Sequence, residues 1–357
     1  MLGLRPPIGI TRTRRRSVFR VLEARPNKSS ELTLVDRLER ALAARQVLLD
    51  DPSTNACRLF NGAADGIAGL VVEKFGDLLV VQLHGGRLKL GLDEVRSLVE
   101  QAHKQLGTRA VYKKAFVPDR SQVSRAIADG HTDAAPWIGE PAEPESVVTE
   151  YGLRFIIRPY AGFSVGLFLE HRENRRRIRE LAAGRRVLNA FAYTCSFSVA
   201  AAAGGAASVS SVDLSKHHLQ WGKQNFTANN VDTTGHRFFC SDIFDFYKRA
   251  ERQQRRFDLI LLDPPTFSRG RRPKRAFVLQ EQLGQLVTRA LDLLDPGGLI
   301  LLATNSRQIS RAQLEQELAA SARAAAKRRC TILERPELPV DFAGDPDYSK
   351  TVIARID

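Results

Sequence analysis

Phe257-Asp258-Leu259-Ile260-Leu261-Leu262-Asp263-Pro264-Pro265-Thr266-Phe267-Ser268 is the stretch of sequence that decides the fold. Its first half holds four consecutive branched apolar residues, a pattern typical of a strand buried on both faces inside a parallel sheet. Its second half contains two prolines, which cannot continue a helix or a strand ladder. The stretch therefore predicts a central strand that ends in a rigid, open loop.

The loop after this strand is a candidate ligand site. In an open α/β sheet, ligands bind in the crevice beyond the carboxyl ends of the strands. Asp263 can accept a hydrogen bond from an N–H group of a flat ring, and Phe267 can stack on the face of that ring. The alternative is a strand-ending turn with a buried phenylalanine, so the rest of the chain has to decide.

Helices and strands alternate on both sides of this stretch. Apolar runs predict strands at residues 186–191, 208–212, 237–240 and 299–304, and the segments between them have helical patterns. Such alternation is typical of a doubly wound, mostly parallel sheet of the α/β class.

Polar side chains recur where these strands end. They are Asn189, Asp213, Asp242 and Asp263. Because the carboxyl ends of parallel strands share one edge of a sheet, all four should line one crevice. Asp213 and Asp242 could each instead cap the helix that follows, and for either one alone the cap is the more common role. Four such residues in register favour a ligand crevice.

The first turn of this predicted sheet, residues 189–196, contains no glycine. A dinucleotide fold needs glycines there so that the backbone can approach a pyrophosphate. Their absence disfavours NAD and FAD and favours a nucleoside cofactor without phosphates, a description that S-adenosylmethionine meets. Asp213 is then the predicted acceptor for the ribose hydroxyls. Asp242 is predicted to accept from the adenine amine, with Ile243 against the adenine ring.

The chain before residue 146 has a different pattern. It predicts helices at residues 31–49 and 92–106, a hairpin from 70–75 and 78–83, and a strand at 110–114. We therefore expect a small α+β domain over residues 31–145 and a Rossmann-like domain over residues 146–357. Residues 1–30 are basic, and are predicted to be a disordered arm that lies on RNA phosphates; an organellar transit peptide is the alternative.

The composition narrows the class of partner. The 357 residues carry 54 Lys and Arg against 40 Asp and Glu, a net charge of +14, which favours a nucleic acid. The four cysteines are scattered without metal-ligand spacing, so we predict no disulfide framework, no metal site and a reduced, cytoplasmic setting. No apolar run is long enough to cross a bilayer. The sequence does not decide between a monomer and a homodimer.

Four motifs in the C-terminal half, at residues 166–172, 188–194, 211–215 and 257–268, are specific in combination. Together they resemble the class I S-adenosylmethionine-dependent methyltransferases of bacterial large-subunit (23S) ribosomal RNA, relatives of the enzymes that methylate cytosine carbon-5 and guanine nitrogen-7. Residues 54–60, 65–70 and 75–77 are similar to the small central domain of that family. The resemblance implies S-adenosylmethionine as cofactor and ribosomal RNA, or an assembly intermediate, as partner. It implies cofactor contacts from Arg172, Asn189, Phe191, Tyr193, Thr194, Asp213, Leu214 and Asp263.

Two departures from the family pattern stand out. Cys195 stands where the family has glycine, so we expect a different loop shape there. The cytosine-modifying members also carry an N-terminal RNA-binding domain of the PUA type, for which residues 1–50 are too short. The basic arm and the small domain would then have to supply the RNA contacts.

The loop at Asn305-Ser306-Arg307 bears on which base is modified. Cytosine carbon-5 is not nucleophilic, so its methylation needs a cysteine thiolate that first adds to the ring. The cytosine-modifying relatives carry this cysteine in the corresponding loop, but neither this loop nor residues 257–268 contain one. A guanine nitrogen needs only desolvation, stacking and alignment with the methyl group. The residues predicted to carry the chemistry are Asp263, Pro264, Pro265, Phe267 and Asn305.

Other interpretations stay open at this point. The basic run at residues 269–275 is predicted to contact phosphates beside the base pocket, the alternative being a solvated charged surface. The same fold could methylate a protein or a small molecule. It could also serve as a non-catalytic RNA-binding or ribosome assembly factor.

Overall fold

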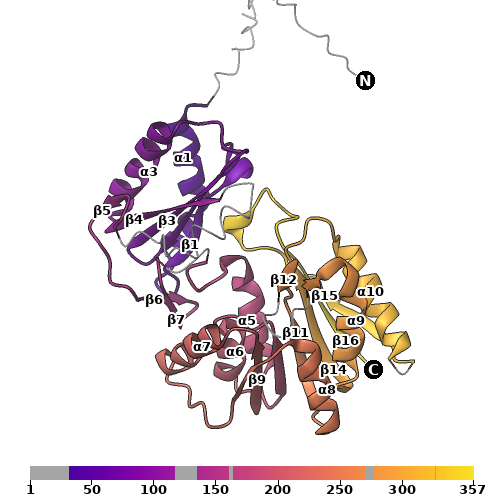
Figure 1. Ribbon diagram of the computed structural model, residues 1–357. Coiled ribbons are helices and arrows are strands. Elements are labelled where there is room, and N and C mark those ends of the chain that lie inside the picture. Colours follow the sequence, from indigo (N-terminus) through magenta and orange to yellow (C-terminus); the bar gives the residue numbers. More distant parts are fainter. Residues whose placement is uncertain (1–31, 117–134, 161–163, 270–275, 326) are drawn as a thin grey trace, which may run out of the picture.

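The computed structural model describes residues 32–116, 135–160, 164–269, 276–325 and 327–357. The predicted basic arm at residues 1–30 lies outside the described residues, as does most of the predicted basic run at 269–275. Figure 1 shows two lobes, an N-terminal one in indigo to purple and a C-terminal one in magenta to yellow.

The N-terminal lobe is a five-stranded sheet in the order β1-β2-β3-β4-β5. Its strands are β1 (Ala56–Asn61), β2 (Leu70–Phe75), β3 (Leu78–His84), β4 (Ala110–Phe116) and β5 (Ile138–Gly139). The pair β3 and β4 is parallel and the other pairs are antiparallel. The predicted helix at residues 31–49 is interrupted at Arg45, which separates α1 (Leu34–Ala44) from α2 (Gln46–Leu49), and α3 (Leu92–Leu106) matches its prediction.

The two faces of this sheet have different neighbours. One face packs against α1 and α3 through a cluster that includes Leu38, Val95 and Leu79. The other face, with Phe75 and Val80, belongs to a cluster that continues into the C-terminal lobe through the hairpin β6 (Ser146–Glu150) and β7 (Leu153–Ile157). Because the core is continuous, the lobes share apolar packing. We propose to keep the predicted domain boundary at residue 146, where this hairpin begins.

The C-terminal lobe is built on a seven-stranded sheet in the order β10-β9-β8-β11-β14-β16-β15. Its strands are β8 (Arg186–Ala190), β9 (Ser208–Asp213), β10 (Arg237–Cys240), β11 (Phe257–Leu262), β14 (Leu294–Thr304), β15 (Cys330–Glu334) and β16 (Lys350–Ile356). The first five strands in this order are parallel, and β16 is antiparallel to both of its neighbours. The prediction of a mostly parallel, Rossmann-like sheet is confirmed.

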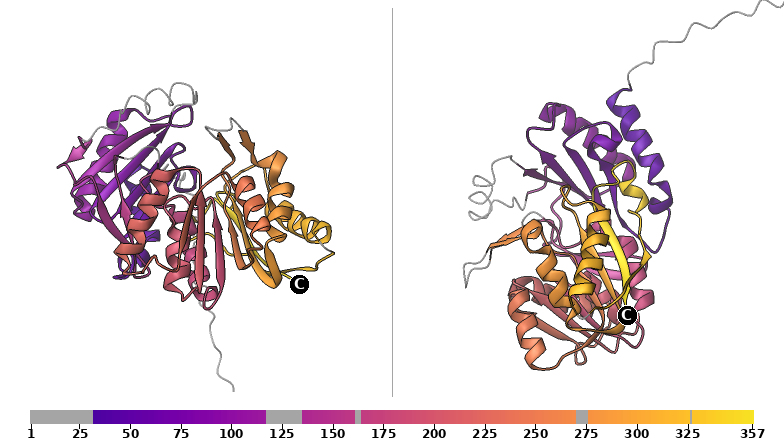
Figure 2. Two further views of the ribbon diagram at one scale, coloured as in Figure 1. Left: turned by 60° about the horizontal axis from the view of Figure 1, so that its bottom comes forward. Right: turned by 90° about the vertical axis from the view of Figure 1, so that its right-hand side faces the viewer.

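Helices cover both faces of the seven-stranded sheet (Figure 2). One face packs against α5 (Arg172–Leu181), α6 (Ser196–Ala203) and α7 (Lys216–Ala228). The opposite face packs against α8 (Ile243–Arg252), α9 (Leu279–Leu291) and α10 (Arg311–Ala324). The central strand β11 contributes to both layers, with Leu259 and Leu261 on the first face and Ile260 and Leu262 on the second. None of the described helices combines the length and apolarity that a membrane span requires.

One local prediction was wrong. The loop after Pro265 is not open, because β12 (Phe267–Arg269) pairs antiparallel with β13 (Ala276–Val278) two residues beyond the second proline. Neither proline lies in this ribbon, so the missing N–H groups cost it no hydrogen bond. Within β14 the register against β11 shifts between the pairs Phe257–Leu294 and Leu259–Leu299.

A buried polar cluster joins the two lobes at β1. The short helix η3 (Val340–Phe342), in the yellow segment of Figure 1, lies against this strand. The carboxylate of Asp341 is fully buried, and it accepts from the backbone N–H of Arg58 at 2.8 Å and from Arg172 Nη1 at 2.8 Å. Arg172 Nη2 donates to the carbonyl of Ala56 at 2.8 Å. One carboxylate therefore holds together β1, α5 and the C-terminal segment.

Candidate active site

A cavity of about 390 Å³ lies beyond the carboxyl ends of β8, β9, β11 and β14. This volume falls within the roughly 300–1,000 Å³ of typical small-molecule sites. Eight of the predicted site residues line it: Phe191, Tyr193, Asp213, Leu214, Asp263, Pro264, Pro265 and Asn305. Residues that the sequence analysis did not assign complete the wall: Phe168, Glu170, His171, Arg175, Ala192, Ser196, Phe197, Ser215, His218 and Ser268.

Asp263 is paired with a buried histidine that comes from a different part of the chain. His171 Nε2 lies 3.1 Å from Asp263 Oδ2. On the other side of the ring, Asn174 Nδ2 lies 3.0 Å from His171 Nδ1 and donates to Thr351 Oγ1 at 2.9 Å. These contacts fix the imidazole so that its Nε2 faces the carboxylate of Asp263. Burial disfavours the charged imidazolium, but attraction to Asp263 and the hydrogen bond to it outweigh this cost, and the pKa of His171 is raised.

Asp213 is oriented by two backbone amides at the end of β9. Its Oδ2 accepts from Tyr193 N at 2.9 Å and its Oδ1 accepts from Ser215 N at 2.8 Å. Ser215, and not Asp213, caps α7, by accepting from His218 N. Asp213 therefore does not serve as the helix cap, and its partly exposed carboxylate faces the cavity with lone pairs to spare.

The loop between β8 and α6 has a strained backbone. Phe191, Tyr193 and Cys195 have φ angles of 61°, 49° and 63°, in the left-handed region that favours glycine. Cys195 is fully buried, and a Cβ added at Gly222 on α7 would lie 2.8 Å from its Cβ. The departure from glycine at Cys195 is thus accommodated by glycine at the facing position. Strain of this kind persists where surrounding structure enforces it, and it concentrates at functional sites.

Three predicted cofactor residues lie outside this cavity with polar side chains that the fold itself uses. Asn189 is buried and donates to Ser198 Oγ at 2.8 Å. Thr194 is buried and donates to the carbonyl of Gly166 at 2.6 Å. Asp242 caps α8, because its Oδ1 accepts from Phe244 N at 2.9 Å and from Asp245 N at 3.3 Å. The adenine contacts of Asp242 and of its neighbour Ile243 stay a prediction.

Two further predicted residues are placed differently from expectation. Arg172 is fully buried against Asp341 and Ala56, so we revise its role from cofactor contact to a joint between the lobes. Phe267 lies on β12, is 41% exposed, and is not among the residues that line the cavity. Its stacking on a base stays a prediction.

Three of the residues missed by the sequence analysis come from the turn before α5. Phe168, Glu170 and His171 belong to the motif at residues 166–172, whose resemblance was noted without a role for these side chains. The motif is shaped by Gly166, which has a φ of 120° and where a Cβ would overlap the indole ring of Trp221. That contact sets the path of the chain over the sheet edge, and no local periodicity signals it.

The geometry of this cavity fits S-adenosylmethionine. This cofactor has a ribose diol, an adenine ring and a positively charged sulfonium and ammonium. The cavity offers the preset carboxylate of Asp213, the apolar walls of Phe191 and Leu214, and the acidic group of Asp263. The turn after β8 has no phosphate-binding glycines, in keeping with a cofactor that lacks phosphates.

Comparison with known proteins agrees with this geometry. A family model described as S-adenosylmethionine-dependent methyltransferase matches residues 78–353. A solved methyltransferase in complex with SAH (S-adenosylhomocysteine) has a TM-score of 0.79 and 27% identity, covering 92% of this chain and 83% of that one. The fold and the site thus define a methyltransferase, and S-adenosylmethionine is its cofactor.

Curated relatives narrow the family. A ribosomal RNA large subunit methyltransferase of Deinococcus radiodurans is 31% identical over 93% of this chain and 81% of its own length. Ribosomal RNA large subunit methyltransferase K of Neisseria meningitidis is 40% identical over 54% of each chain. The chain belongs to the family of S-adenosylmethionine-dependent methyltransferases that contains these large-subunit enzymes, as the sequence resemblance predicted.

Proposed function

We propose that this enzyme methylates a guanine nitrogen in the ribosomal RNA of the large subunit. The RNA substrate is supported by the names of the curated relatives, which cover most of this chain, and by the net charge of +14. The choice of a nitrogen rests on one observation, the position of the cysteines relative to the cavity.

All four cysteines lie in the described part of the chain, and none is among the residues that line the cavity. Cys57 and Cys195 are buried, and burial raises the pKa of each thiol to about 12. A thiol that stays protonated is not a nucleophile at neutral pH. Without a thiolate facing the base, addition to a cytosine ring has no partner in this cavity. Methylation at a nitrogen lone pair needs no thiolate.

The residues of the cavity divide into two groups under this proposal. Asp213 and Leu214 hold the nucleoside part of the cofactor, and Phe191 and Tyr193 shape its loop. When bound, S-adenosylmethionine supplies an electrophilic methyl group. Asp263 accepts from an N–H group of the guanine, and Pro264, Pro265 and Asn305 position the ring. His171 is a positioning residue, because its contact with Asp263 orients that carboxylate.

Methylation of isolated RNA tests the proposal. Large-subunit RNA from a strain that lacks the gene would be incubated with the enzyme and labelled S-adenosylmethionine, then digested and mapped by mass spectrometry. We expect one methylated guanosine with the label on a nitrogen, and no product with Asp263→Ala. A 5-methylcytidine product would overturn the choice of atom. Labelling of protein or small molecules alone would overturn the choice of RNA.

A further inference from the structure

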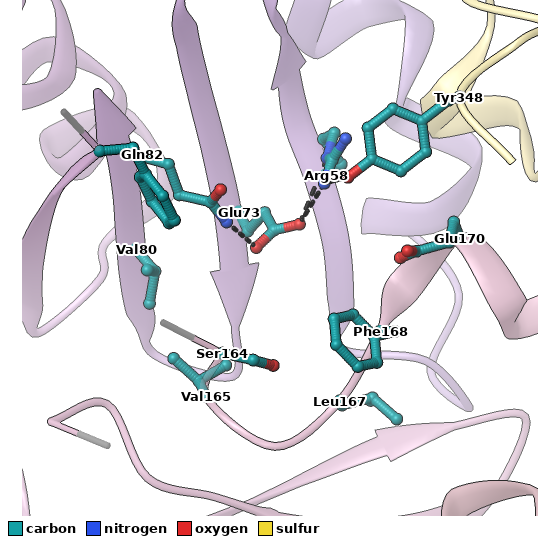
Figure 3. Close-up of a pocket in the computed structure, with 11 residues that line it drawn as sticks. Arg58, Glu73, Val80, Gln82, Ser164, Val165, Leu167, Phe168, Glu170 and Tyr348 are labelled. Carbon is teal, nitrogen blue, oxygen red and sulfur yellow. Dashed lines mark hydrogen bonds and ion pairs between the residues drawn. The ribbon is translucent and has the colours of Figure 1, made fainter. Parts of the chain in front are cut away.

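A second cavity, of about 190 Å³, adjoins the active site between the two lobes. Its walls come from β1 to β4 on one side and from residues 164–170 on the other (Figure 3). Phe168 and Glu170 line both cavities, so the second one opens beside the active site rather than at a distance from it. Neither the family match nor the relatives' names assign a role to it.

Most polar groups on the small-sheet side of this cavity are already engaged. Arg58 Nη2 donates to Glu73 Oε1 at 2.8 Å and to the hydroxyl of Tyr348 at 2.9 Å. Gln82 Nε2 donates to Glu73 Oε2 at 2.9 Å, and within the described residues the amide oxygen of Gln82 has no hydrogen-bond donor. Figure 3 shows this chain of contacts along one wall.

Glu170 is the exception in this cavity. It is 5% exposed, and within the described part of the chain no other side chain lies at hydrogen-bond distance from its carboxylate. Burial raises the pKa of this carboxyl, although attraction to His171 and Arg58 opposes the shift. Figure 3 shows the carboxylate directed from the C-terminal lobe toward the small sheet. The backbone N–H of Glu170 itself donates to this carboxylate, which leaves further lone pairs that a ligand with N–H donors can satisfy.

The groups that remain available define the ligand. Glu170 and the amide oxygen of Gln82 are acceptors, so the ligand should present N–H donors. Phe168 is 41% exposed although it is a large apolar ring, which suits stacking against a flat partner. Guanine presents two adjacent donors, N1–H and the N2 amino group, which a single carboxylate can accept together. An uncharged apolar ligand would leave the remaining lone pairs of the Glu170 carboxylate unsatisfied.

We propose that this second cavity binds a guanine that neighbours the target nucleotide in the RNA, with its ring on Phe168 and its N1–H and N2–H groups on Glu170. The proposal rests on the RNA substrate proposed above. The shared wall places the two bases on opposite sides of Phe168 and Glu170, as expected for nucleotides that are close in one strand. The cavity thereby adds a sequence requirement beside the modified base.

Substitution on both partners tests this proposal. Once the methylated nucleotide is mapped, short RNA hairpins would carry inosine in place of each guanine within two nucleotides of the target, since inosine lacks only the N2 amino group. With the wild-type enzyme, one such RNA should lose about tenfold in kcat/KM, the size expected for one lost donor. Glu170→Gln should lose a similar factor on unmodified RNA and should no longer distinguish inosine from guanine at that position.

The controls separate the possible failures. Glu180→Gln, an equivalent change on the exposed side of α5, should keep the wild-type preference. If the wild-type enzyme methylates no hairpin, the proposed substrate fails before this inference is reached. If it methylates all hairpins equally, or if Glu170→Gln still discriminates against inosine, the second base site is wrong and the cavity only holds water. The inosine series uses the wild-type enzyme, so it tests the second base site even if a variant fails to fold.

Discussion

Arg172 Nη1 donates to Asp341 Oδ1 at 2.8 Å, and neither side chain is exposed to solvent. The two residues are 169 positions apart in the chain. The carboxylate also accepts from the backbone N–H of Arg58, so a single acid satisfies donors from both lobes. The second cavity lies beside this joint, with Arg58 and Tyr348 in its wall.

Removal of the Asp341 charge should destabilise the whole enzyme. Asp341→Asn leaves the buried guanidinium of Arg172 without its counterion, and breaking such a pair typically costs about 3–5 kcal/mol. Urea denaturation of the full chain should show this loss in the free energy of unfolding. Glu315→Gln removes the exposed pair with Arg335 and should leave the unfolding midpoint unchanged. An equal effect of both changes would contradict the assignment of Asp341 as a joint.

Substitution of His171 should slow the reaction without weakening cofactor binding. His171→Gln removes the imidazole that orients Asp263, so kcat should fall by about 10-fold to 100-fold, toward the lower end of general acid and base effects. The affinity for SAH, measured by calorimetry, should stay close to that of the wild type. A loss confined to the affinity would instead place His171 in the cofactor site.

The same pair should make stability depend on pH. The pKa of His171 is raised in the folded protein, so protonation stabilises the fold. This contribution is complete below the ordinary histidine pKa of 6.5 and is lost as the pH rises through the higher, folded value. The stability difference between wild type and His171→Gln, measured by thermal unfolding, should therefore shrink as the pH rises above 6.5. A constant difference across this range would contradict the sign of the shift.

Substitutions of Asp213 and of Asp242 should have different effects on the affinity for SAH. Asp213→Asn weakens the acceptor that faces the cavity, and a lost hydrogen bond to a charged group is worth about 1.5–3 kcal/mol, or at least tenfold in the Kd for SAH. Asp242→Asn keeps an effective helix cap. If Asp242 serves only as the cap, its substitution leaves the Kd unchanged. A loss of affinity in that variant would support the predicted contact with adenine.

Cys195 and Gly222 should behave as a coupled pair. Gly222→Ala places a methyl group against Cys195, and overpacking of this kind costs about 1–3 kcal/mol. Cys195→Gly removes the obstacle and also relieves a positive φ. In that background, Gly222→Ala should be neutral or stabilising, since it replaces a glycine within a helix. Thermal unfolding of the four proteins measures the coupling, and additive effects would contradict the contact.

The sequence allowed a better prediction of the residues that end the strands than of the residues that surround them in the site. Asp213 and Asp263 end apolar runs, and the parallel sheet brings those ends together without further information. His171 could not be placed in the same way, because its position depends on the packing of Gly166 against Trp221. Arg172 carried a misleading signal, since it lies within a site motif while its partner, Asp341, is distant in sequence.

The order of the last strands in the sheet could not be predicted from the periodicity of apolar residues, for a topological reason. A run of apolar residues indicates that β16 exists, but not that it pairs with β14 and separates it from β15. The ribbon of β12 and β13 was not predicted for a related reason. Two prolines exclude strand pairing only at their own positions. Predictions from the sequence therefore worked where residues next to each other decide the outcome.

The position of β16 has a consequence for how the enzyme is made. A ribosome releases β15 before β16, although among the described strands β15 pairs only with β16. Until residues 350–356 emerge, the nascent chain presents the unpaired edge of β14, and β15 has no strand to join. Asp341 and Tyr348, which close the joint with β1, lie between β15 and β16 in the chain and so emerge after β15 as well. Synthesis therefore leaves both the sheet and the contact between lobes open until residues 350–356 emerge, and during this interval the edge of β14 is exposed to a nascent-chain chaperone.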